Sequence, residues 1–159
     1  MAIHSVDKKL RESRFFLDRM RECERVPSRY WEPFDFFLSA FLSATRTIDD
    51  RLRHEREDQY KHWRVAWNKK RTPADNALIK FMIDDRGFEV HEIGSSRDGS
   101  IDLHVKAPDL GASEIEPGAF FIPANWFTIQ GEKRKVTDVC EQYLALLQAM
   151  VAQFLAENP

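Results

Sequence analysis

One segment near the start of the chain repeats bulky side chains every three or four residues over about four turns of helix. These residues are Phe37, Phe41, Leu42, Thr45, Ile48 and Leu52. The spacing is that of an α-helix with one buried face, and such a face is stable only when other elements cover it. Small residues lie between the bulky ones and would let a second helix approach closely. The segment therefore predicts a long central helix, from Pro33 to about His54, in a mainly helical protein.

The same apolar period recurs in the rest of the chain. We expect further helices over residues 5–24, 58–71, 73–86 and from about 137 to the end. Thr72 can cap the fourth helix, Pro73 suits its first position, and Gly87 is expected to end it. Residues 92–131 differ, because glycines and prolines interrupt short β-prone pieces there. The sequence predicts a single domain, 1–159: an up-and-down bundle of four to five helices, with a small β hairpin inserted before the last helix.

Charge and cysteine content limit the classes of partner and site. Lys and Arg number 24 and Asp and Glu 26, so the net charge of -2 offers no global attraction to nucleic acid or to an anionic membrane. An electrostatic partner would have to bind a local patch. Cys23 and Cys140 match no zinc spacing, and no His-Glu-x-x-His or glycine-rich phosphate loop occurs, so we expect neither a metal nor a cofactor. Charged residues at the N-terminus argue against a secretory signal, and we expect a cytoplasmic protein.

An arginine and a histidine provide the first candidate for chemistry. Arg86 and His91 are separated by four residues at the expected end of the fourth helix. Converging on one phosphodiester, the guanidinium would neutralise the phosphate, and an imidazole titrating near neutrality would move a proton. Such a pair could cleave RNA without a metal. Two other Arg–His pairs have similar spacing, so spacing alone does not select this one, and Arg86 could instead be an ordinary cation at a helix C-terminus.

The order of elements adds a resemblance. The segment Phe36–Arg46 on the central helix, followed by the Arg-x4-His match after the fourth helix, resembles the HEPN superfamily of small helical bundles. The resemblance implies a homodimer that brings two Arg/His pairs together in a cleft, with Arg86 and His91 as the catalytic pair. It also implies RNA processing or phage defence, including toxin–antitoxin action beside a nucleotidyltransferase-type partner. Non-catalytic relatives are known as a class, so a helical module that binds a protein partner remains the alternative.

Two further clusters carry charge. The segment 60–71 contains five Lys or Arg residues and no acid, and it includes Arg64, Lys69, Lys70 and Arg71. Beside its aromatic residues, this face could contact phosphates and stack bases. It could also be only a solvated face, because Tyr60, Trp63 and Trp67 share one stripe typical of a core.

On the central helix, Arg46, Asp49, Asp50 and Arg53 alternate in charge at helical spacing. Arg46 and Asp50 could line a polar cleft that binds substrate. They could also form an exposed ion pair worth a few tenths of a kcal/mol.

Overall fold

The computed structural model describes residues 3–25, 32–91, 98–102 and 122–159, with side chains at 85–91, 98–102 and 122–124 outside the description. These residues form five helices and three strands. In chain order they are α1 (His4–Cys23), α2 (Glu32–Glu55), α3 (Glu57–Lys70), α4 (Pro73–His91), β1 (Asp98–Asp102), β2 (Ile122–Ile129), β3 (Glu132–Lys135) and α5 (Val136–Glu157). The mainly helical bundle with a small hairpin before the last helix is confirmed.

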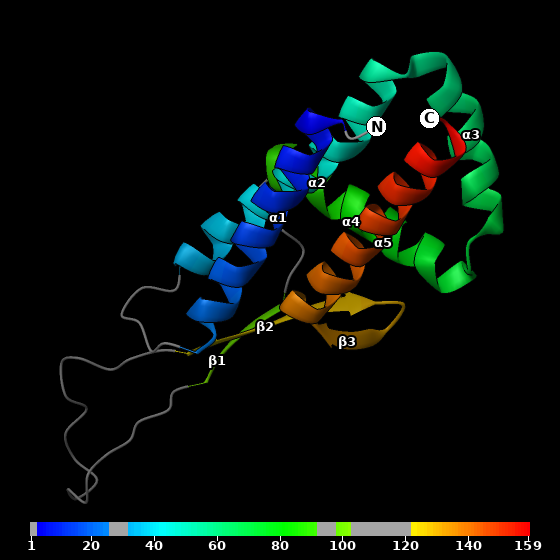
Figure 1. The fold of residues 1–159 in the computed structure, drawn as a ribbon. Helices are drawn as coiled ribbons and strands as arrows, with labels where there is room; N and C mark the ends of the chain where they lie inside the picture. The colour runs from blue at the N-terminus through cyan, green and yellow to red at the C-terminus, as the bar shows by residue number, and fades with distance from the viewer. Residues whose placement is uncertain (1–2, 26–31, 92–97, 103–121) are drawn as a thin grey trace, which may run out of the picture.

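Helices α1 and α2 form an antiparallel pair (Figure 1). The Ser5 hydroxyl at the start of α1 donates a hydrogen bond to Glu55 at the end of α2. Helix α5 also runs antiparallel to α1, since Thr137 at its start bonds Glu24 beyond the end of α1, while Arg14, earlier in α1, binds Glu141 through two hydrogen bonds of 2.5 and 2.7 Å. The predicted helix boundaries in these segments agree with the structure to within a few residues.

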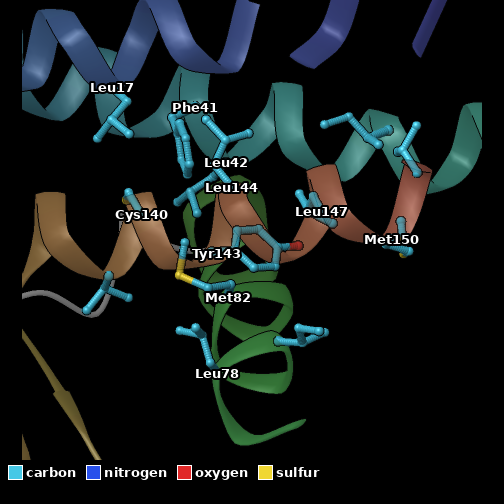
Figure 2. Packing of buried hydrophobic residues seen from close by; sticks show 14 of the residues in the cluster. Leu17, Phe41, Leu42, Leu78, Met82, Cys140, Tyr143, Leu144, Leu147 and Met150 are labelled. Atoms are coloured by element: carbon cyan, nitrogen blue, oxygen red, sulfur yellow. The ribbon is translucent and has the colours of Figure 1, made fainter. Parts of the chain in front are cut away.

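Helix α5 is the centre of the hydrophobic core. Figure 2 shows Leu17 of α1 and Phe41 of α2 on one side of α5, and Leu78 and Met82 of α4 on the other. Ten residues of α5 are buried, namely Val136, Thr137, Val139, Cys140, Tyr143, Leu144, Leu147, Met150, Val151 and Phe154. Because neighbours surround it on several sides, a helix in this position must be apolar over most of its circumference.

The apolar composition of α5 is also typical of membrane-spanning helices. Among the described residues, α5 is long and apolar enough to cross a membrane by length and composition. Buried core helices meet the same criteria, and the packing of α5 against α1, α2 and α4 accounts for its apolar residues here.

The strands form an antiparallel sheet in the order β1-β2-β3. Ile129 of β2 faces Glu132 of β3 across a two-residue turn, in which Gln130 and Gly131 have φ of 52° and 84°. Positive φ at both central positions is typical of the tight hairpin turn whose twist matches that of the strands. Buried Phe127 packs edge-on against Phe81 of α4, with ring centroids 5.0 Å apart, and this contact anchors the sheet to the bundle.

The predicted end of the fourth helix was wrong. Gly87 does not stop α4, whose backbone continues to His91. A glycine inside a helix costs about 1 kcal/mol relative to alanine, an amount that surrounding structure can offset. The prediction relied on this local preference alone.

Candidate functional site

A carboxylate on α2 organises the polar contacts between α2 and α3. Asp49 accepts hydrogen bonds from the buried Tyr60 hydroxyl and from Nε of Arg64, the latter at 3.1 Å. Burial, followed by the nearby Asp49 charge, raises the pKa of Tyr60 well above its usual value. Tyr60 therefore stays a neutral donor at any physiological pH. The prediction that Tyr60 belongs to the core is confirmed, but its hydroxyl also links two helices.

Two arginines of the basic segment lie against a buried indole. The guanidinium carbon of Arg71 is 3.8 Å from the centroid of the Trp67 ring, and that of Arg64 is 4.8 Å from it. Such contacts favour a cation over the ring face and remove part of each guanidinium from water. The alternative of a wholly solvated basic face is therefore wrong for Arg64 and Arg71, both of which are half-buried.

Two asparagines complete this group. The side-chain oxygen of Asn68 accepts hydrogen bonds from both Arg64 and Arg71, the second at 2.7 Å. The side-chain oxygen of Asn76, in the first turns of α4, accepts from Nε and Nη2 of Arg71 at 3.1 and 2.7 Å. We call Arg64, Trp67, Asn68, Arg71 and Asn76 the arginine–tryptophan cluster.

Arg71 is incompletely paired. Its Nη1 is buried and has no hydrogen-bond acceptor among the described residues. Burial, followed by repulsion from Arg64, lowers the pKa of Arg71 to about 10. The guanidinium is still charged at neutral pH, and the charges of Asp75 and Asp49 act in the opposite direction on its pKa.

Tyr143 of α5 lies within reach of the same charges. Burial and then the Asp49 carboxylate raise the pKa of Tyr143 to about 12, while the charges of Arg46, Arg64 and Arg71 act in the opposite direction. The charges of Asp49, Arg46, Arg64 and Arg71 therefore all influence this buried hydroxyl. The Asp49 carboxylate has the largest effect of these four charges.

Arg46 and Asp50 are not drawn into this cluster. The Arg46 Nε lies 4.0 Å from Asp50, and Asp50 makes its shorter contact, 2.6 Å, with Arg53. All three side chains are more than a third exposed, as in an ordinary ion pair on a helix surface. Asp50 and Arg53 border a shallow hollow at the α2–α3 corner, together with His54, Glu57 and Lys61.

Lys69 and Lys70 lie at the exposed end of α3, between Asn68 and Arg71 of the arginine–tryptophan cluster. Both side chains are solvated, so they can contact an anionic partner without a change in the fold. Trp67, by contrast, is 7% exposed, and a nucleic-acid base has no open ring face to stack on there. The prediction of base stacking in this segment is therefore wrong for Trp67.

The predicted catalytic positions lie near the end of α4. The backbone places Arg86 and His91 on one continuous helix, while their side chains fall outside the described residues. Positions five residues apart are about 140° apart around a helix axis and about 7.5 Å apart along it. One copy of α4 therefore does not place them one above the other on a single face.

The sequence had not indicated Asn76, nor that Asn68 is a shared acceptor. The signal was weak, because asparagines near helix ends are common capping and turn residues. In the part of the chain that the structure describes, no three His, Cys, Asp or Glu side chains gather in a way that could hold a metal ion. No protein-family model, curated protein or solved structure matches the chain.

Proposed function

We propose that this chain is a HEPN-like protein of RNA processing or phage defence that acts as a metal-independent endoribonuclease. The observation that supports the proposal is the continuity of α4 from Pro73 to His91, past Gly87. A catalytic pair must be held on a rigid element to remain within reach of the reacting atoms. Both proposed positions, Arg86 and His91, lie on this continuous helix.

The angle between the two positions leads to the second part of the proposal, a cytoplasmic homodimer. Because one α4 carries Arg86 and His91 on different sides, a second copy related by a two-fold axis would complete the site, with Arg86 of one protomer beside His91 of the other. A phosphodiester bound between the protomers would then meet two guanidiniums and two imidazoles.

The proposed chemistry follows from these groups. A neutral His91 imidazole takes the proton of the 2'-hydroxyl, and the oxygen attacks the adjacent phosphorus. The bond from phosphorus to the 5'-oxygen breaks, and a protonated imidazole supplies the proton to that leaving oxygen. Arg86 binds the phosphate and stabilises the charge that develops on it. The products are a 2',3'-cyclic phosphate and a free 5'-hydroxyl.

Other residues have proposed supporting roles. Lys69 and Lys70 would guide RNA by contacting its backbone phosphates, assisted by Arg64 and Arg71, and Arg46 and Asp50 would line the path. A nucleotidyltransferase-type antitoxin is the proposed protein partner, as the resemblance implies.

The test is cleavage of a mixed RNA pool in EDTA by the purified protein and by the variants Arg86→Ala and His91→Ala. We expect cleavage by the wild type, loss of at least a hundredfold in each variant, and partial recovery when the two variants are mixed. Recovery requires that one protomer supply the arginine and the other the histidine. Cleavage that persists in both single variants would exclude this pair.

A non-catalytic interaction module is the second candidate, and one observation favours it. Phe15 of α1 and Phe36 of α2 are 52% and 67% exposed, unusual for phenylalanine in a well-packed bundle. Exposed aromatic side chains are common anchors of protein interfaces. If no form of the protein cleaves RNA, a pull-down with Phe36→Ser as the control variant tests this candidate.

A further inference from the structure

The two guanidiniums of the arginine–tryptophan cluster share one neutral acceptor. Arg64 and Arg71 both donate to the side-chain oxygen of Asn68, although an amide oxygen carries only a partial negative charge. Two cations directed at one oxygen repel each other, and the attraction of both to an anionic oxygen would offset this repulsion. Asp49 contacts Arg64 directly, through its Oδ1 and the Arg64 Nε, whereas Asp75 and Asp49 act on Arg71 through their charges.

Of the two nitrogens on the Arg71 edge that faces Asn68, only one has a hydrogen-bond acceptor among the described residues. Along this edge Nη2 donates to Asn68, while Nη1 has no acceptor among the described residues. The opposite side of the fork, formed by Nε and Nη2, is already directed at Asn76. A guanidinium edge binds best to a group with two oxygens, as in a carboxylate or a phosphate, and the amide of Asn68 supplies only one.

The Asn68 side chain is also the accessible part of the cluster. It is exposed at the end of α3, whereas Arg64 and Arg71 are half-buried and Trp67 is buried. An exposed side chain can rotate away without disturbing the core. Lys69 and Lys70, adjacent in sequence and exposed, increase the attraction for an incoming anion.

From these contacts we infer that Arg64 and Arg71 form a phosphate-binding site. One phosphate oxygen replaces the Asn68 side-chain oxygen between the two guanidiniums, and a second oxygen accepts from Nη1 of Arg71. Because Trp67 is covered, the site recognises the phosphate and not a base. The ligand is a phosphate group, whether free or part of a nucleic-acid backbone. The inference does not depend on Arg86 or His91, and binding can be measured without cleavage.

The experiment is a titration of ¹⁵N-labelled protein with sodium phosphate at constant ionic strength, following the Trp67 indole and arginine Nε–H signals by NMR. We expect a saturable shift in the wild type. Asn68→Asp places two carboxylate oxygens where the phosphate would bind, so this variant should fold, melt at a higher temperature and bind phosphate at least tenfold more weakly. Arg71→Lys keeps the charge but loses the fork and should weaken binding to a similar extent.

Lys61→Gln is the matched control, because Lys61 is a cation of the same helix that pairs with Glu57 away from the cluster. Its phosphate affinity should equal that of the wild type. The inference is overturned if the wild type shows no saturable shift, or if Asn68→Asp binds phosphate as tightly as the wild type. It is also overturned if Lys61→Gln weakens binding as much as Arg71→Lys does.

A second arm of the experiment separates the two sources of phosphate. The same variants are titrated with a single-stranded RNA oligonucleotide whose termini carry no phosphate. If the site takes backbone phosphodiesters, Asn68→Asp and Arg71→Lys lose RNA affinity and inorganic phosphate competes with RNA. If the site takes free phosphate or terminal monoesters, RNA affinity is the same in Asn68→Asp and in the wild type, while phosphate binding is lost.

Discussion

Removing the charge of Asp49 should cost more stability than removing any nearby surface charge. In the wild type the Asp49 carboxylate accepts from the Tyr60 hydroxyl and from Arg64, and the side chains of Arg64 and Asp49 are only 18% and 26% exposed. The substitution Asp49→Asn keeps an oxygen in place, so both hydrogen bonds can persist without the charge. The effect of charge is thereby separated from the effect of shape.

The magnitude follows from the two contacts. A hydrogen bond to a charged group contributes about 1.5–3 kcal/mol and a neutral one about 0.5–1.5 kcal/mol, so the Tyr60 bond, whose two partners are both neutral in the variant, loses about 1 kcal/mol. Arg64 then also lacks a counter-charge beside Arg71, which brings the expected loss to about 2–3 kcal/mol. For a domain of this size, that loss lowers the Tm by about 4–12 °C.

The assay is thermal unfolding followed by circular dichroism at 222 nm and pH 7, with urea unfolding as a second measurement. Asp50→Asn is the control, because Asp50 pairs with Arg53 at 2.6 Å on an exposed surface. Its effect should stay within about 0.5 kcal/mol. If Asp49→Asn melts within 1–2 °C of the wild type, or if the two variants are equally destabilised, the contacts of Asp49 do not stabilise the bundle as argued.

Three further predictions concern the core, the α1–α5 contact and the basic end of α3. Leu147→Ala should lower the free energy of unfolding by about 2–5 kcal/mol in urea, because Leu147 is 2% exposed and its loss leaves a cavity. The hydrogen bond from Arg14 lowers the pKa of the Glu141 carboxyl. The stability that this bond gives the folded protein is therefore complete above the ordinary glutamate pKa, and it is lost as the pH falls through the lower folded-state pKa. Between pH 7 and pH 3, the Glu141→Gln variant should therefore lose less stability than the wild type. The difference between the two losses should be about 1 kcal/mol or less, because the Arg14–Glu141 pair is a third exposed. Changing Lys69 and Lys70 together to Gln should reduce the slope of log affinity for single-stranded RNA against log salt by about 1.4, which corresponds to two phosphate contacts.

Each of these predictions can fail in a specific way. A loss below about 1 kcal/mol in Leu147→Ala would mean that the helices around α5 collapse into the space. An equal loss of stability at low pH in Glu141→Gln and the wild type would show that the Arg14 contact does not favour the ionised carboxylate. An unchanged salt slope in the double lysine variant would place the RNA contact elsewhere on the surface.

The helices were predictable because their apolar residues repeat at the period that burial requires. Phe41, Ile48 and Leu52 follow this period on α2 and are buried in the core. The end of α4 was not predictable in this way. At Gly87 the local preference for a stop competes with tertiary context, which sequence periodicity does not report.

The arginine–tryptophan cluster shows the same limit at the level of side chains. The sequence placed Arg64 and Arg71 on a basic face of α3, and it also placed Trp67 in the core. It did not reveal that the long arginine side chains fold back over the indole, because flexible side chains can cover apolar surface while their helical positions face water. The contact between Arg71 and Asn76 depends on the turn that joins α3 to α4, which no periodic pattern describes.

The junction between β3 and α5 has a consequence for any molecule that binds the sheet. β3 ends at Lys135 and α5 begins at Val136, so no intervening residue can absorb a rotation of the hairpin. Lys135 also bonds to Glu24 beyond the end of α1, at 2.9 Å. A ligand that tilts the hairpin would therefore apply torque directly to α5, the helix about which the other helices pack. Its binding would change the free energy of unfolding of the entire bundle.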